Sequence, residues 1–181
     1  MGYTHYWTLK KSIGNKMSDI ANDFKKILLI LKTSGIKIAN WDGKGKPIIN
    51  NEEIKFNGIE KCGHDKKPLT LSLPEYIKFA NWLQNSDYDL YCNGDCSHES
   101  FVLTKIFLSE MDFCKTAMKP YDIAVTTCLI IAKHYLKEDI EISSDGDEDK
   151  WRIARILCQS CLGYGMKEKL NIKGGNYEKN Y

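Results

Sequence analysis

The chain has 181 residues and a mass of 20.8 kDa, the size of one domain. Its apolar share of 43% can fill a buried core, while the charged share of 28% and the mean hydropathy of −0.42 argue against a membrane protein. The longest nearly apolar stretch, 123–132, is shorter than the roughly 20 residues that span a bilayer. We find no basic-then-apolar leader after Met1, so we expect no secretory signal.

Charge is unevenly distributed along the chain. Residues 1–67 have a balance of +6, residues 75–149 a balance of −9 and residues 150–181 a balance of +5, which gives the net charge of +2. Domains that bind nucleic acid usually carry a dense basic stripe and a pI above about 9, whereas the pI here is about 8.1. We therefore expect neither duplex nucleic acid nor a membrane as a partner.

Alternation of apolar and polar residues predicts strands, and apolar residues at intervals of three and four predict helices. The predicted strands are 2–10, 36–41, 52–56, 100–107, 112–116 and 140–143. The predicted helices are 18–33, about 73–84, about 121–136 and 147–162. Turn-forming residues predict breaks at 42–45, 57–58 and 144–146.

This order predicts an α+β fold with a mixed β-sheet and packed helices. The helix at about 121–136 is apolar on most sides, so we expect it to be central and buried. We expect a single domain over 1–170, in which 59–97 forms a loop-rich insertion with a short helix. Residues 171–181 have the composition of a flexible tail.

The first strand carries polar aromatic residues. Tyr3 and His5 should face one side of it and Tyr6 the other. In a functional interpretation, His5 and a tyrosine line a ligand pocket and an aromatic ring stacks on a base. The alternative is an aromatic core strand with a hydrogen-bonded buried histidine, and the sequence leaves both open.

A second group of candidates lies where a strand leads into the buried helix. Free N–H groups at a helix start can receive an anion, and Lys115, Thr116 and Lys119 would then meet a phosphate or carboxylate. Tyr121 and Asp122 follow directly and are included in the candidate ligand site. The alternative is a connector in which Thr116 or Asp122 serves the helix N-terminus and the lysines are solvated.

Further candidates lie at predicted strand ends, where mixed sheets often place ligands. Ser144 and Asp145 would bind a sugar hydroxyl, and Asn57 would join the same site. His98 is, with His5, a candidate general acid or base, because histidine titrates near neutral pH. The alternatives are a turn with a helix cap for the first two residues and a solvent-exposed strand entry for His98.

Seven cysteines, an odd number without a leader before them, indicate a reducing compartment. Five sulfur and nitrogen donors stand in two predicted loops: Cys62, His64, Cys92, Cys96 and His98. A structural zinc site takes four such ligands, but these spacings match no standard pattern cleanly. We therefore interpret them as free thiols and histidines in surface loops and predict no metal and no other cofactor, with zinc as the alternative.

Five motifs together resemble a family of small hypothetical proteins from phages and bacteria. They are Met1–Trp7 (MGYTHYW), Phe56–Gly58 (FNG), His98–Phe101 (HESF), Phe113–Asp122 (FCKTAMKPYD) and Ser143–Asp147 (SSDGD). The resemblance covers most of residues 1–147, although 59–97 is longer than it leads us to expect. It implies a phage protein in the cytoplasm of the host cell. By analogy with phage anti-defence proteins of similar size, it implies a nucleotide immune signal as the ligand.

The sequence therefore suggests a phage-type pocket protein that binds and sequesters a nucleotide-derived small molecule. The first alternative is a hydrolase or phosphodiesterase acting on such a nucleotide, with His5 or His98 as the acid/base group. The second is an interaction module that inhibits a host factor through the acidic middle of the chain. Homo-oligomerisation stays open in all three.

Overall fold

The computed structural model describes residues 2–64, 92–106 and 111–173. In this part of the chain an α+β fold contains three helices and eight strands, with a short 3₁₀ turn, η1 (Lys137–Asp139). The α+β prediction is thus confirmed. The helix expected at about 73–84 lies outside the described residues.

The first sheet has the strand order β6-β1-β7-β8. Its strands are β1 (Thr4–Leu9), β6 (Asp112–Lys115), β7 (Ile140–Asp147) and β8 (Asn171–Lys173). β1 runs antiparallel to both β6 and β7, whereas β7 and β8 are parallel, so the sheet is mixed. Three residues of the expected C-terminal tail therefore belong to the sheet as β8.

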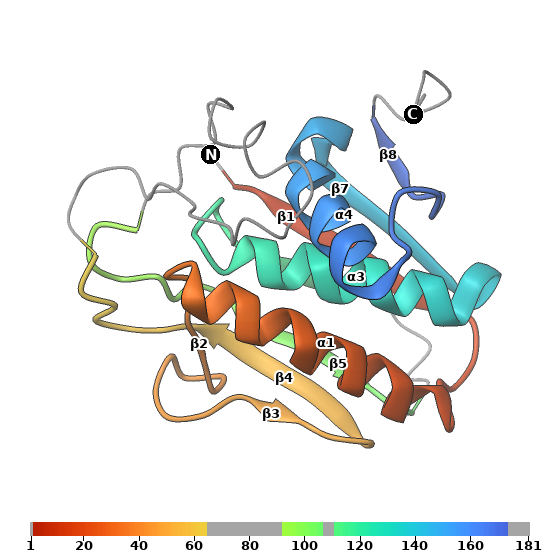
Figure 1. Cartoon of the computed structure of the whole chain (residues 1–181), viewed down its shortest axis with the longest axis horizontal. Helices are drawn as coiled ribbons and strands as arrows, with labels where there is room; N and C mark the ends of the chain where they lie inside the picture. The colour runs from red at the N-terminus through yellow and green to blue at the C-terminus, as the bar shows by residue number, and fades with distance from the viewer. Residues whose placement is uncertain (1, 65–91, 107–110, 174–181) are drawn as a thin grey trace.

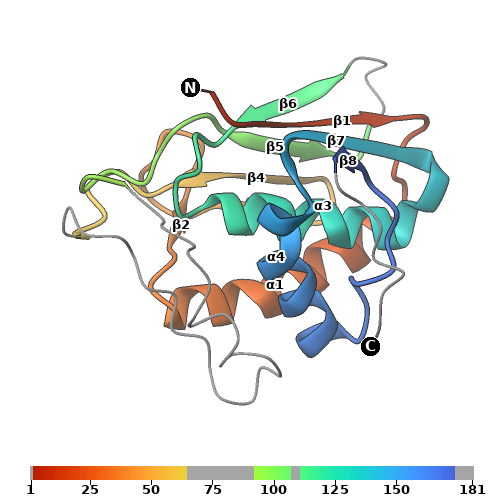
Figure 2. The ribbon, with the colours of Figure 1, turned by 90° about the horizontal axis from the view of Figure 1, so that it is seen from above.

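The second sheet has the order β2-β4-β3, and β5 also pairs with β4. Its strands are β2 (Ile38–Ala39), β3 (Ile48–Ile49), β4 (Glu53–Gly58) and β5 (Phe101–Thr104). Trp7 of β1 packs against Phe101 of β5 at 4.9 Å between ring centroids, and Phe101 packs against Phe56 of β4 at 5.0 Å. This aromatic row joins the two sheets into one core, and Figure 2 shows their strands on one side of the helices.

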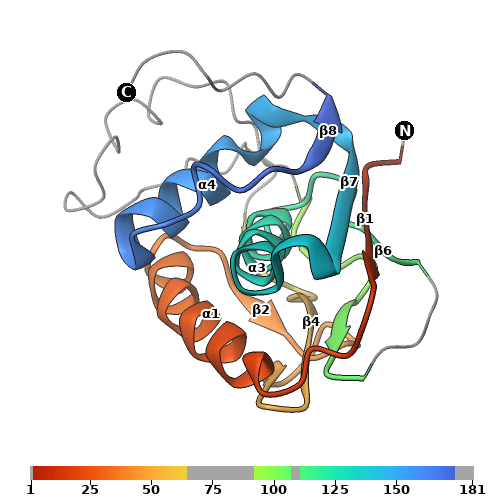
Figure 3. The same cartoon turned by 90° about the vertical axis from the view of Figure 1, so that its right-hand side faces the viewer.

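The helices are α1 (Lys16–Thr33), α3 (Asp122–Leu136) and α4 (Glu148–Leu162). α3 is buried along nearly its whole length, as its apolar run 123–132 predicts. It contacts α1, α4 and β7, and in the end-on view the strands curve around it while α1 and α4 close the other side (Figures 1 and 3). The expectation of a buried central helix is confirmed.

Two predicted turns are wrong. Asn57 and Gly58 are the last residues of β4, paired with β2, and Ser144–Gly146 continue β7 instead of ending it. Ser144 pairs with His5 across the sheet, and the Asp145 carboxylate accepts a hydrogen bond from the Thr4 backbone N–H at 3.0 Å. These contacts keep the segment in the sheet, although its composition alone predicts a turn.

In the described part of the chain, every helix is too short or too polar to cross a membrane.

Candidate functional site

A chain of three polar side chains runs from β7 through β1 to the start of α3. The Ser144 Oγ lies 3.0 Å from His5 Nδ1, and His5 Nε2 lies 2.8 Å from Asp122 Oδ1. Antiparallel pairing places His5 directly opposite Ser144 on the inner face of the sheet, and Asp122 is in the first turn of α3. Segments 139 and 117 residues apart in sequence thus meet at one histidine.

The hydrogen bonds in this chain have a direction. An ionised carboxylate only accepts hydrogen bonds, so His5 Nε2 carries the proton and donates to Asp122. In a neutral imidazole the other nitrogen, Nδ1, is then an acceptor, and the Ser144 hydroxyl donates to it. Asp122 Oδ1 accepts a second hydrogen bond from the Thr116 hydroxyl, and the backbone N–H of Gly146 donates to Ser144 Oγ at 3.0 Å.

Aromatic rings enclose the histidine. Tyr3 and Trp151 each meet the His5 ring edge-on, with centroids 5.1 Å away, and His5 has 0% exposure. The Tyr3 hydroxyl and the Trp151 Nε1 are buried without a hydrogen-bond partner among the described residues. A buried donor left unpaired costs about 1–3 kcal/mol, so this region has donors that an acceptor from water or a ligand would satisfy.

Tyr3 packs over the backbone of Gly146. A Cβ at position 146 would overlap the Tyr3 hydroxyl, which explains glycine at this point of β7. Burial, and next the charge of Asp122, raise the pKa of Tyr3 well above its ordinary value. The hydroxyl therefore stays protonated at neutral pH and can only donate to, or accept from, a neighbour as a neutral group.

The outer face of the same sheet carries the remaining residues of this cluster. Tyr6 is half-buried, and its hydroxyl lies 3.4 Å from Asp145 Oδ1. Asp145 is exposed, and its other oxygen binds the Thr4 amide. Lys115 of β6 pairs with Thr4 of β1, and the Lys115 side chain lies beside Gly2. Of the predicted ligand residues, the structure thus brings Tyr3, His5, Thr116, Asp122 and Ser144 together on the inner face, whereas Tyr6 and Asp145 meet on the outer face and Lys115 lies at the edge.

Lys119 and Tyr121 form hydrogen bonds with the backbone of the loop at 95–99 and not with His5. The Lys119 ammonium donates to the backbone oxygens of Asp95 at 2.9 Å and of Ser97 at 2.5 Å. The Tyr121 hydroxyl donates to the Glu99 backbone oxygen at 2.7 Å, and burial raises its pKa well above the ordinary value. Asp122 itself places a carboxylate in the first turn of α3, a favourable charge at a helix N-terminus.

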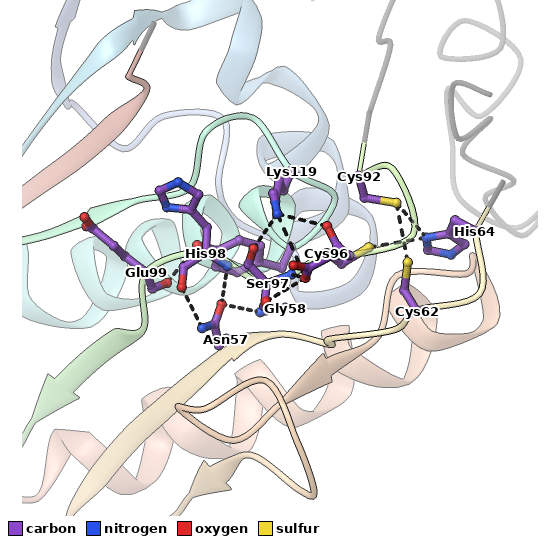
Figure 4. A network of polar contacts seen from close by, with 12 residues as sticks. Asn57, Gly58, Cys62, His64, Cys92, Cys96, Ser97, His98, Glu99 and Lys119 are labelled. Atoms are coloured by element: carbon purple, nitrogen blue, oxygen red, sulfur yellow. Dashed lines mark hydrogen bonds and ion pairs between the residues drawn. The ribbon is translucent and has the colours of Figure 1, made fainter. Parts of the chain in front are cut away.

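Asn57 holds the same loop from the other side (Figure 4). Its amide donates to the His98 backbone oxygen at 2.8 Å, and its Oδ1 accepts from the His98 N–H at 2.9 Å. Asn57 is buried, whereas the His98 side chain is exposed. A Cβ on Gly58 would overlap the Cys96 backbone oxygen. The Asn-Gly pair therefore fits the close approach of this loop to β4.

Four of the five sulfur and nitrogen candidates also gather at one place. The ligand atoms of Cys62, His64, Cys92 and Cys96 all lie within 4.8 Å of one another, and His98 is outside the group (Figure 4). All seven cysteines are free thiols. Cys96 lies in the loop that Asn57 holds, so this group is separate in its contacts from the His5 cluster.

Sequence reasoning missed Trp151 and Glu99 as members of these networks. Trp151 has the spacing of a core residue in α4, which says nothing of the histidine it touches. Glu99 binds the backbone N–H of Lys115 through its carboxylate at 2.8 Å. No local pattern signals either contact, because both join elements that are distant in sequence.

No family model, no curated protein and no solved structure matches the chain.

Proposed function

We propose that the protein is a hydrolase in which Ser144 is the nucleophile, His5 the general base and Asp122 the group that orients and stabilises the histidine. The observation that carries this proposal is the directional chain Ser144–His5–Asp122, with 3.0 Å and 2.8 Å between successive heavy atoms. An activated serine is recognised by two features: the nucleophile lies within hydrogen-bond reach of the base, and a third group holds the base in place.

The hydrogen-bond directions give the steps. As Ser144 Oγ forms a bond to a carbonyl carbon, its proton moves to His5 Nδ1, and Asp122 stabilises the resulting imidazolium. The same proton then protonates the leaving alkoxide as the ester bond breaks, giving an acyl-serine. Water attacks the acyl-serine with His5 again as base, and this releases the acid and restores the Ser144 hydroxyl. The Tyr3 hydroxyl, which interacts with Ser144, is a candidate donor to the developing oxyanion.

The charges around the site favour an uncharged ester over a phosphodiester. Asp122, Asp145 and Asp147 all act on the Tyr3 hydroxyl electrostatically. Lys119 is engaged by the 95–97 loop, which leaves Lys115 as the predicted phosphate-binding lysine beside the cluster. An anionic phosphate at Ser144 would meet more negative than positive charge, whereas a neutral carbonyl ester would not.

A fluorophosphonate probe tests the nucleophile without knowledge of the substrate. We expect the probe to label the wild-type protein at Ser144 and p-nitrophenyl acetate to be hydrolysed. Ser144→Ala should abolish labelling, and Ser143→Ala should keep it, because Ser143 pairs with Tyr6 and lies on the outer face of the same strand. Circular dichroism melting checks that both variants fold.

Absence of labelling in the folded wild-type protein contradicts the proposal. Labelling that survives Ser144→Ala contradicts it equally, because another residue would then be the nucleophile. His5→Gln and Asp122→Asn should reduce the labelling rate by at least about 100-fold, the range of general-base catalysis.

Binding of a nucleotide-derived ligand without conversion is the second candidate function. The observation in its favour is that five of the predicted ligand residues lie in one cluster on the inner face of the sheet, beside the buried Trp151 Nε1, which has no hydrogen-bond partner among the described residues. Thermal shift with cyclic dinucleotides and ADP-ribose derivatives, followed by mass analysis of the released compound, separates the candidates. An intact ligand supports sequestration, whereas a converted one would show cleavage of a phosphate linkage and contradict the preference for an uncharged ester.

A further inference from the structure

A second cluster lies where the chain leaves the second sheet and returns to it. Cys62 and His64 follow β4, while Cys92 and Cys96 precede β5. Their sulfur and nitrogen atoms come within 3.3–3.4 Å of one another at three contacts, Cys62–Cys92, Cys92–His64 and Cys96–His64 (Figure 4). The four side chains therefore converge on one point between two chain segments.

These spacings match the edges of a tetrahedral metal site. Zn–S bonds of about 2.3 Å and Zn–N bonds of about 2.0–2.1 Å put neighbouring ligand atoms about 3.5–3.8 Å apart. The four atoms here lie between 3.3 Å and 4.8 Å from one another. Shifts of up to about half an ångström per atom would bring each ligand to its bonding distance around a central ion.

His64 is oriented as a ligand by its other ring nitrogen. Nε2 lies 3.1 Å from the backbone oxygen of Gly35, just beyond α1. A carbonyl oxygen can only accept, so Nε2 carries the proton and Nδ1 presents its lone pair to the sulfurs of Cys92 and Cys96. Such an outer hydrogen bond to a backbone carbonyl is the usual support of a metal-binding histidine.

The backbone already holds both segments in place. Cys62 N–H donates to the Gly94 oxygen at 3.0 Å, and Cys96 N–H donates to the Ile59 oxygen at 3.1 Å. Residues with positive φ angles turn the backbone of each segment: Lys61 and Gly63 in one, Asn93 and Gly94 in the other. The donor atoms are thus fixed by turns and cross-links and not only by contact with one another.

Two other interpretations fit less well. A disulfide needs about 2.05 Å between sulfurs, and the Cys62 and Cys92 sulfurs lie 3.4 Å apart as free thiols. Solvated surface thiols, the interpretation preferred from the sequence, do not fit Cys92 and Cys96, which are 7% and 2% exposed. Three cysteines and one histidine form a donor set suited to zinc rather than to magnesium or calcium.

We propose that Cys62, His64, Cys92 and Cys96 bind one zinc ion as a closed structural site. All four positions are filled by protein, which leaves none open for a reacting water. The ion would join the exit of β4 to the entry of β5 and, through His64 and Gly35, to the end of α1. It would thereby hold the two ends of the insertion at 59–97 together.

Metal analysis of untagged protein, purified with a reductant and without chelators, tests this site. We expect one zinc ion per chain by elemental mass spectrometry. Replacement by Co²⁺ should give the visible bands of a tetrahedral ion and a near-ultraviolet thiolate-to-cobalt band. Cys62→Ser and Cys96→Ser should lose the bound zinc and weaken Co²⁺ binding by at least about tenfold, the loss typical even of changes outside the ligand sphere.

Cys161→Ser is the matched control, because Cys161 is a half-buried free thiol like Cys62 but lies in α4 outside the cluster. It should keep full metal content. The Co²⁺ titration of the wild-type protein keeps the test independent of whether a variant folds. A reduced wild-type protein without a thiolate-to-cobalt band overturns the proposal, as does full zinc content in both ligand variants.

Discussion

Arg155 and Arg152, the two arginines of the chain, have different surroundings in α4. Arg155 makes a two-pronged ion pair with Glu148, with Nε and Nη2 each 2.9 Å from a carboxylate oxygen. Its Nη1 also donates to the backbone oxygens of Gly165 at 2.7 Å and Glu168 at 3.1 Å. Lysine has neither the planar fork nor enough donors in this geometry, so the identity of this residue matters more than its charge.

We expect Arg155→Lys to lower the free energy of unfolding by about 2–4 kcal/mol, since it leaves part of a buried ion pair unmatched. Arg152→Lys is the control, because Arg152 pairs with an Asp149 side chain that is 74% exposed. Such surface pairs contribute about 0–1 kcal/mol. Urea unfolding measures both variants, and equal losses would show that the buried fork has no special role.

Asp23 should make stability depend on pH. Burial acts to raise the pKa of Asp23, but hydrogen bonds from Lys26, Tyr135 and Tyr164 outweigh it and hold the pKa below its ordinary value. A carboxyl group with a lowered pKa stabilises the fold above its unfolded pKa of about 3.9, and this contribution is lost as pH falls through the folded-state pKa.

Asp23→Asn should therefore destabilise the protein by about 1–3 kcal/mol at pH 7, from the loss of hydrogen bonds to a charged group. The difference from wild type should shrink below pH 4 or so, as the wild-type carboxyl takes up its proton. Urea unfolding at pH 7 and at acid pH gives both values. A difference that stays constant over this range would assign the loss to packing and not to charge.

At the scale of elements, the helices can be predicted from the sequence, whereas several strands are too short to be predicted. α1 follows from the apolar spacing of one segment, and α3 follows from a long run that is apolar on most sides. β3 and β8, of two and three residues, have too few positions for a pattern. The end of β7 was missed for another reason, because Ser-Asp-Gly has turn composition and the partners that keep it extended, Thr4 and His5, are remote.

The candidate sites show the same limit. Residue types identified His5, Ser144 and Asp122 as polar groups near element ends, but which of them meet depends on strand register, which distant pairing sets. Because the sequence predicts a turn at Ser144, it does not predict that this side chain lies on the inner face of the sheet. For the cysteines, spacing within each loop matched no standard motif, and the two halves come together through contacts between distant segments: backbone hydrogen bonds from Cys62 to Gly94 and from Cys96 to Ile59, and the contact of Asn57 with His98.

At the scale of the whole molecule, α3 joins the other two helices to the first sheet. The two sheets meet through the aromatic row Trp7, Phe101 and Phe56, and α1 stacks Phe24 on Phe56 at 5.3 Å. α3 contacts the first sheet through β7 and contributes Asp122 to the His5 chain. Two sheets that share one core should unfold together, because the apolar face of each sheet stays buried only while the other sheet is folded.

Ile131→Ala tests this shared core, because Ile131 is 0% exposed in the middle of α3. Removing a buried isoleucine side chain costs about 2–5 kcal/mol. If unfolding is cooperative, the best-protected amides of β1 and β7 and those of β4 and β5 should lose hydrogen-exchange protection by the same factor, about 30-fold or more. Leu29→Ala, at a position 69% exposed on α1, should change protection little. Loss confined to the first sheet would mean that the two sheets unfold as separate units despite the aromatic row between them.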